Sequence, residues 1–203
     1  MNGSSKQETD RFLLWIDSVG GFWVCTKEEV TLGQPGCGRE VDVAILGDLS
    51  RRHARIRRDG EGYLVEAVRE VRVDGRRAEP VASLVDGSTI ELGQGGVRLV
   101  FRRPNALSAT ARLDFASHHH TEPRTDAVLL MAESCILGPS SHSHVVCADW
   151  PQEVILYRHH DKLYCRTPGV MKIDGVRCVD RGGPLGRNSQ IVCDRFSLGL
   201  EAV

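Results

Sequence analysis

The sequence contains an internal repeat, which limits the folds open to this chain more than any other feature. Short apolar segments of the first half recur in the same order in the second half, at an offset of about 100 residues. The matched pairs are VTLG (30–33) with CILG (135–138), ARI (54–56) with VIL (154–156), GYLV (62–65) with KLYC (162–165), VRVDG (71–75) with MKIDG (171–175), and LVDGSTI (84–90) with LGRNSQI (185–191). Unrelated apolar runs would not keep one order and one offset, so the sequence predicts two copies of one fold.

The repeated segments have the character of β-strands. They are short, rich in Val, Ile and Leu, and separated by Gly, Asp, Pro or Ser, and no stretch keeps a helical period. Asp-Gly pairs at 74–75 and 86–87 indicate tight hairpin turns. The predicted fold class is all-β, with two tandem β-sandwiches, and the first copy has predicted strands at 12–16, 21–25, 30–32, 43–45, 54–57, 63–66, 71–73, 89–92 and 97–102.

The boundary between the copies is expected near Pro104 and Asn105, which gives one domain over 1–104 and a diverged domain over 105–203. Residues 112–115 are expected to form the first strand of the second copy, as 12–16 do in the first. The histidine-containing tract 117–123 then lies in a loop. This assignment avoids a long linker without structure, which compact proteins rarely contain.

Charge and composition exclude some classes of function. The chain has 26 basic and 27 acidic side chains, a net charge of −1, which argues against a protein that coats nucleic acid. No apolar run is long enough to cross a membrane and the first ten residues are polar, so the expected location is the cytoplasm. Seven cysteines without a CxxC pair are expected to be reduced and mostly buried, and neither a metal nor a cofactor is predicted.

The segment GDLSRRHA (47–54) carries a resemblance to a known family. Together with VTLG (30–33), VAI (43–45) before the motif and LVDGSTIELG (84–93) after it, it resembles a forkhead-associated (FHA) domain over about residues 12–103. The resemblance implies a β-sandwich whose loops at one end bind phosphothreonine in partner proteins. The whole chain also resembles a bacterial group, familiar from planctomycetes, in which such a domain is followed by SATARL (108–113) and a diverged copy.

The family pattern implies a set of site residues in the first copy. A phosphothreonine dianion needs charge-assisted donors, for which a hydroxyl and a guanidinium are well suited. By resemblance, the phosphopeptide-binding residues are Ser50, Arg51, Arg39 and Gln34, and the structural supports of the binding loop are Gly33 and His53.

The first copy departs from the family pattern at two points. Gln34 stands where the family has an arginine, and it cannot supply the lost charge, although Arg39 can take that role if its longer loop folds back. The Asn-Gly loop that holds the peptide backbone in the family is missing between Ala67 and Val71. An arginine cluster (Arg51, Arg52, Arg55, Arg57 and Arg58) could form a basic patch or a solvated sheet face.

The second copy departs further from the family pattern than the first. It has DWPQEV (149–154) in place of the motif, so phosphothreonine binding is not expected there, and Trp150 is either a partner anchor or a cover for the sandwich end. The histidines at 118–120, 142 and 144 could in principle bind a metal, but solvated loop histidines are the simpler interpretation. Cys37 lacks an identifiable base for a nucleophilic role.

Three hypotheses follow, from different classes. The leading one is a non-catalytic module for protein–protein interaction in bacterial signalling, which binds a phosphothreonine-containing or acidic partner. The alternative is a structural scaffold that binds partners independently of phosphate, which Gln34 favours. An enzyme comes third. Neither the oligomeric state nor the partner can be read from the sequence.

Overall fold

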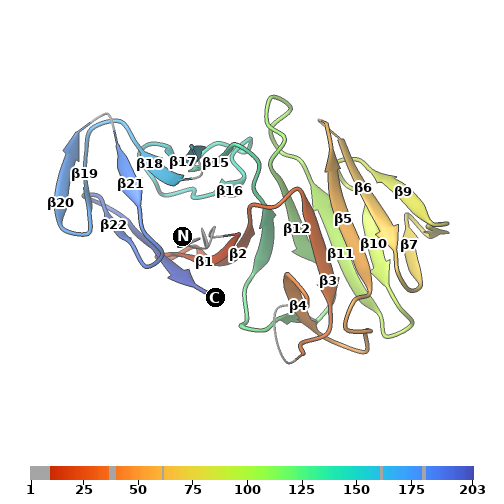
Figure 1. Cartoon of the computed structure of the whole chain (residues 1–203). Helices are drawn as coiled ribbons and strands as arrows, with labels where there is room; N and C mark the ends of the chain where they lie inside the picture. The colour runs from red at the N-terminus through yellow and green to blue at the C-terminus, as the bar shows by residue number, and fades with distance from the viewer. Residues whose placement is uncertain (1–9, 37–39, 61, 161, 180–181) are drawn as a thin grey trace, which may run out of the picture.

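The computed structural model describes residues 10–36, 40–60, 62–160, 162–179 and 182–203, and these residues form strands and no helix (Figure 1). The first half holds β1 (Arg11–Ile16), β2 (Gly20–Cys25), β3 (Glu29–Gly33), β4 (Val43–Leu46), β5 (Ala54–Asp59), β6 (Gly62–Ala67), β7 (Val71–Val73), β8 (Arg76–Arg77), β9 (Val81–Leu84), β10 (Thr89–Leu92) and β11 (Val97–Arg102). The second half holds β12 (Ala111–Phe115), β13 (His120–Thr121), β14 (Ala127–Leu130), β15 (Ser134–Gly138), β16 (Val145–Val146), β17 (Val154–His159), β18 (Lys162–Arg166), β19 (Val170–Ile173), β20 (Val176–Val179), β21 (Gly183–Leu185), β22 (Gln190–Val192) and β23 (Ser197–Ala202). The all-β prediction is confirmed, and within the described ranges no helix could span a membrane.

The strands form three sheets. One sheet has 12 strands in the order β20-β19-β22-β23-β1-β2-β14-β12-β11-β10-β7-β8. A 6-stranded sheet (β13-β4-β3-β5-β6-β9) shares one hydrophobic core with the β8 half of the long sheet. A 5-stranded sheet (β16-β15-β17-β18-β21) shares the other core with the β20 half. The long sheet therefore belongs to two sandwiches.

The centre of the long sheet is buried on both faces. In β14, Val128 and Leu130 belong to one core, whereas Ala127 and Leu129 belong to the other. Strands β1 and β2 alternate between the cores in the same way. Successive side chains of a strand point to opposite faces, so the two sandwiches lie on opposite sides of this sheet. This explains why FLLWI (12–16), GFWVC (21–25) and AVLL (127–130) are almost continuously apolar.

The first strands of the two copies are exchanged, and the predicted domain limits are wrong in this respect. Strand β1 pairs with β23, from Phe12 opposite Ala202 to Ile16 opposite Leu198. Strand β12 pairs instead with β11, with Leu113 opposite Phe101. We therefore define the first sandwich as β3–β14 and the second sandwich as β1, β2 and β15–β23. Figure 1 shows the red β1 and β2 beside the cyan and blue strands of the second half. The repeat identifies equivalent strands, but equivalent apolar patterns cannot show which partner each strand pairs with.

The two sandwiches contain equivalent hydrogen bonds at the positions that the repeat matches. In the first, the amide of Thr31 donates to Asp42 Oδ2 at 2.9 Å, and in the second the amide of Ile136 donates to His144 Nδ1 at 2.9 Å. Strands β2 and β14 pair in parallel, and the cores lie on opposite faces of the sheet. The copies are therefore related by an approximate twofold axis along the strand direction.

The cysteines are reduced, as predicted, wherever the structure describes them. Cys25, Cys135, Cys147 and Cys165 are buried free thiols, and Cys178 and Cys193 are half-buried free thiols. Burial raises the pKa of Cys135, Cys147 and Cys165 to about 12, so these thiols stay protonated and behave as small apolar side chains. Cys37 lies outside the described residues.

His144 makes the stability of the chain dependent on pH. It is fully buried, and burial lowers its pKa from 6.5 to about 4, with a further contribution from the Arg112 guanidinium, which donates to the His144 carbonyl at 3.0 Å. Because the unfolded chain binds the proton more tightly, stability is complete above about pH 6.5 and falls as the pH approaches 4. We expect a loss of about 2 kcal/mol at pH 5 relative to neutral pH, measured by urea unfolding.

A pair of substitutions isolates this effect. His144→Asn keeps an acceptor for the Ile136 amide but does not titrate. The stability that this variant loses between neutral pH and pH 5 should therefore be smaller than that of the wild type by about 2 kcal/mol. His142 is exposed, so His142→Asn should behave like the wild type. Equal pH dependence in wild type and His144→Asn would contradict the assignment.

Candidate functional site

One end of the first sandwich carries the residues that the sequence singled out. We call this the loop end; it consists of residues 34–36 and 40–42 after β3, 47–53 between β4 and β5, 68–70 between β6 and β7, 93–96 between β10 and β11, and 116–119 after β12. The Gln34 amide donates to the Ser50 carbonyl at 3.1 Å, and the Gly93 amide donates to the Glu70 carbonyl at 2.9 Å. Main-chain hydrogen bonds therefore join four of these strand connections in two pairs.

Gly33 lies directly against the loop that carries Ser50 and Arg51. A Cβ atom at this position would lie 1.9 Å from the Arg51 carbonyl oxygen and 2.8 Å from that of Ser50. Only a glycine allows so close an approach of two main chains. The end of β3 therefore fixes the main chain of Ser50 and Arg51.

His53 joins two of the loops, 47–53 and 68–70. It is 4% exposed; its Nδ1 accepts from the Ser50 amide at 3.2 Å, so its Nε2 carries the hydrogen and donates to the Glu70 carbonyl at 2.9 Å. Its own carbonyl accepts from the amides of Val68 at 3.2 Å and Arg69 at 2.9 Å. All the polar groups of this residue are engaged in structural bonds, so it supports the loop end rather than contacting a ligand.

The side chains of Ser50 and Arg51 are available to a ligand. Ser50 is half-buried and Arg51 is exposed, and within the described residues neither side chain has a hydrogen-bond or ion-pair partner. Arg52 and Arg69 are also exposed and have no acidic partner in the described part of the chain. The loop end therefore presents three guanidinium groups without compensating carboxylates.

The remaining members of the arginine cluster, Arg55, Arg57 and Arg58, lie in β5. Arg55 lies 3.8 Å from Glu29 and 3.7 Å from Glu66, and Arg58 lies 3.9 Å from Glu28. These are ordinary surface ion pairs. The cluster thus divides into residues of β5, of which Arg55 and Arg58 are ion-paired, and an unpaired group at the loop end.

Two other predicted features concern the loops beside Ser50. Gln34 is exposed, and its main chain contacts Ser50. It therefore lies beside the candidate site, but its side chain carries no charge. Arg39 lies outside the described residues. Only residues 68–70 separate β6 from β7, so the loss of the Asn-Gly loop is confirmed.

The strand exchange brings the histidine tract to the loop end of the first sandwich, which the sequence did not reveal. β13 pairs with β4, and His119 lies 3.0 Å from the position that a Cβ of Gly47 would occupy. Burial, followed by neighbouring His118 and His120, lowers the pKa of His119, which is therefore uncharged at neutral pH. Among the described residues, no three His, Cys, Asp or Glu side chains are arranged to hold a metal ion.

The equivalent end of the second sandwich carries a stacked aromatic pair beside a cavity of about 580 Å³. Trp150 stacks on Phe196 with ring centroids 3.9 Å apart, and only 6% of it is exposed, so it covers the sandwich end and is not a partner anchor. Gln152 donates to Thr167 Oγ1 at 3.0 Å and to the Pro168 carbonyl at 2.6 Å. Gln152 thus joins two loops of the second sandwich by hydrogen bonds, as His53 does in the first.

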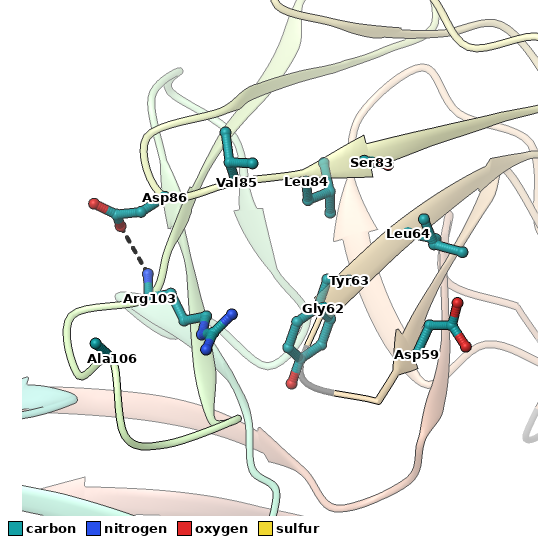
Figure 2. A pocket seen from close by; sticks show the side chains of 10 residues that line it. All are labelled: Asp59, Gly62, Tyr63, Leu64, Ser83, Leu84, Val85, Asp86, Arg103 and Ala106. Atoms are coloured by element: carbon teal, nitrogen blue, oxygen red, sulfur yellow. Dashed lines mark hydrogen bonds between the residues drawn. The ribbon is translucent and has the colours of Figure 1, made fainter.

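The opposite end of the first sandwich has a cavity of about 530 Å³ (Figure 2). The hydroxyl of Tyr63 donates to the Ala109 carbonyl at 2.7 Å, and the Arg103 amide donates to Asp86 Oδ1 at 2.8 Å. The Arg103 side chain also donates to the Ser108 carbonyl at 3.3 Å. These bonds fix the connection from β11 to β12, which borders the cavity.

Comparison with solved structures finds FHA domains. The FHA-2 domain of a Mycobacterium tuberculosis ABC transporter is 23% identical, with a TM-score of 0.34, and the match covers 45% of this chain and 76% of that chain. An FHA domain from Chlamydia trachomatis is 27% identical (TM-score 0.29; 41% and 89% covered), and one from an Arabidopsis thaliana hypothetical protein is 21% identical (TM-score 0.31; 46% and 86% covered). No protein-family model and no curated protein matches the chain.

Proposed function

We propose that the first sandwich is an FHA-type module that binds a phosphothreonine-containing segment of a partner protein at its loop end. Ser50 and Arg51 contact the phosphate, Gln34 lies beside it, and Gly33 and His53 hold the loop; Arg39, the further binding residue expected from the sequence, lies outside the described residues. The observation that carries this proposal is the fixed main chain at Ser50 and Arg51 with both side chains left unengaged. The module is non-catalytic, since its histidine is used in structural bonds.

The chemistry of the site suits a phosphate dianion. A guanidinium is permanently charged and offers paired donors to phosphate oxygens, and a serine hydroxyl adds a further donor. Preorganisation of the loop by Gly33 and His53 reduces the conformational entropy lost on binding. Since Gln34 supplies no charge, we expect the interaction to depend strongly on Arg51 and to weaken as salt rises.

The second sandwich serves as a support in this proposal. Its loop end carries the stacked Trp150 and Phe196 in place of the motif around Ser50, and its strands β1 and β2 pack behind the first sandwich. The reduced state of the described cysteines favours a cytoplasmic setting. We place the activity in bacterial signalling on the resemblance described above.

A titration of three variants against the wild type tests the proposed site. Ser50→Ala and Arg51→Ala should each weaken binding of a phosphothreonine peptide about tenfold or more, because each removes a charge-assisted hydrogen bond. Arg57→Ala, on the outer face of β5, is the matched control and should bind like the wild type. Isothermal titration calorimetry measures each affinity.

The second candidate function is a scaffold that binds partners independently of phosphate. The replacement of the family's arginine by Gln34 favours it. This candidate predicts equal affinity for the phosphorylated and unphosphorylated peptides and indifference to Ser50→Ala and Arg51→Ala. That outcome would reject the phosphate-binding proposal.

A further inference from the structure

We propose that Arg69 forms a second anion-binding subsite, which binds an acidic side chain of the same partner segment beside the phosphothreonine. This inference rests on the proposed function, because it takes the phosphate at Ser50 and Arg51 as the first contact. The partner class that it names is an acidic phosphopeptide rather than a phosphopeptide of any sequence.

Arg69 and Ser50 are held by one residue. The amide of Arg69 donates to the His53 carbonyl at 2.9 Å, while the His53 ring accepts from the Ser50 amide at 3.2 Å. The connection from β6 to β7 contains only residues 68–70, so it has little freedom to move away. Arg69 is therefore anchored next to the phosphate site rather than carried on a long loop.

A groove begins at Arg69. It has a volume of about 620 Å³ and lies between the β6–β7 connection and the residues around β8, with Val68, Ala78 and Pro80 among its apolar lining. An extended peptide that leaves the phosphate site on this side would pass Arg69 and enter the groove. A peptide bound in this groove would therefore contact Arg69, whereas an isolated surface arginine has no such binding surface beside it.

The other charges of the groove are neutralised within the protein. Arg77 lies 3.5 Å from Glu79, and Glu70 lies 3.4 Å from Arg72. Hydrogen bonds from Gln94 and Arg72 lower the pKa of Glu70, so this carboxylate stays ionised and engaged. Arg69 reaches only the Val68 carbonyl, at 3.4 Å, within the described residues. It is the uncompensated charge of the groove, so the groove favours an acidic ligand group.

This arrangement offsets the two departures from the family pattern. Gln34 removes a cation from the phosphate site, and the missing Asn-Gly loop removes a contact to the peptide backbone. The short connection that carries Arg69 restores one cation at the loop end. This cation binds an acidic side chain of the partner and not the phosphate itself. Affinity is then divided between phosphate and a nearby carboxylate.

The test uses the full chain and pairs of synthetic peptides. Each peptide is centred on phosphothreonine or on threonine, and one glutamate, with glutamine as its neutral twin, is placed at each flanking position in turn. At one or more positions we expect the wild type to prefer glutamate over glutamine about tenfold, as one charge-assisted contact provides. Arg69→Ala should abolish this preference while the ratio between phosphorylated and unphosphorylated peptides stays unchanged. Arg57→Ala is the control and should keep both ratios.

The two ratios separate this inference from the proposed function. If Arg69→Ala keeps the glutamate preference, or if the wild type shows none at any position, the Arg69 subsite is rejected. If the phosphate ratio is one but the glutamate preference depends on Arg69, the proposed function fails and the acidic subsite stands. Absence of binding to every peptide would overturn both.

Discussion

A fragment that ends at Pro104 is expected to lose cooperative unfolding. It retains the sequence repeat unit but lacks β12, which pairs with β11, and β14, which pairs with β12; both strands close the first core. Leu113, Val128 and Leu130 are at most 3% exposed in the full chain. Removing them takes away about 6 kcal/mol of apolar burial, which is comparable to the whole stability of a typical domain. Urea unfolding followed by circular dichroism measures the loss.

The matched control is a fragment of similar length, residues 26–131. This contiguous segment contains β3–β14, that is, every strand of the first sandwich. It should unfold cooperatively because every strand of the first sandwich is present. Its stability should be lower than that of the full chain, because it lacks Leu13 and Trp23, which contribute to the first core, and because Leu129 and Met131 become exposed. A cooperative 1–104 fragment together with an unfolded 26–131 fragment would contradict the strand exchange.

Gly33→Ala is expected to destabilise the loop end and to abolish phosphopeptide binding. The added methyl group would meet the Arg51 carbonyl oxygen at 1.9 Å, which is main chain and cannot rotate away. One of the two main chains must therefore shift, at a cost of about 3 kcal/mol. The same shift displaces Ser50 from its contact with Gln34. Thermal unfolding and peptide titration measure the two effects.

Gly36→Ala is the control for this substitution, because Gly36 lies in the same loop. A Cβ atom there would meet only the Arg51 Cδ atom at 3.8 Å, which is ordinary van der Waals contact. Its stability should stay within about 0.5 kcal/mol of the wild type, with unchanged binding. If the two alanine variants behave alike, the close approach at Gly33 has no role in holding the site.

Much of the fold could be predicted because its signals are local. Alternating apolar residues and Asp-Gly turns located the strands of the first copy, and Asp74 and Gly75 both have positive φ in the turn from β7 to β8. Strands β8 and β9 were missed: β8 has only two residues, both arginine, and β9 does not alternate clearly. Signals of two to four residues are too short to distinguish a strand from a loop.

The strand exchange could not be predicted, because pairing is a non-local property. Equivalent strands of a repeat have equivalent patterns, so either first strand fits either core. One signal was present: FLLWI (12–16) and AVLL (127–130) are apolar on both faces, which a sandwich with one solvated face does not need. Such runs indicate strands buried between two cores.

The candidate site was partly accessible from sequence. The motif at 50–53 identified Ser50, Arg51 and His53, and the structure places all three at one loop end. Arg69 was missed, because the connection from β6 to β7 departs from the family pattern and only the His53 carbonyl shows where it lies. The histidine tract was assigned to the wrong sandwich as a direct consequence of the exchange.

The central claim, that the first sandwich binds phosphothreonine, is tested most directly by one measurement. The full wild-type chain is titrated with a phosphothreonine peptide and with its unphosphorylated twin under the same salt conditions. The account predicts that phosphorylation strengthens binding about tenfold or more, since the phosphate gains charge-assisted bonds from Ser50 and Arg51. Equal affinity for the two peptides would contradict it.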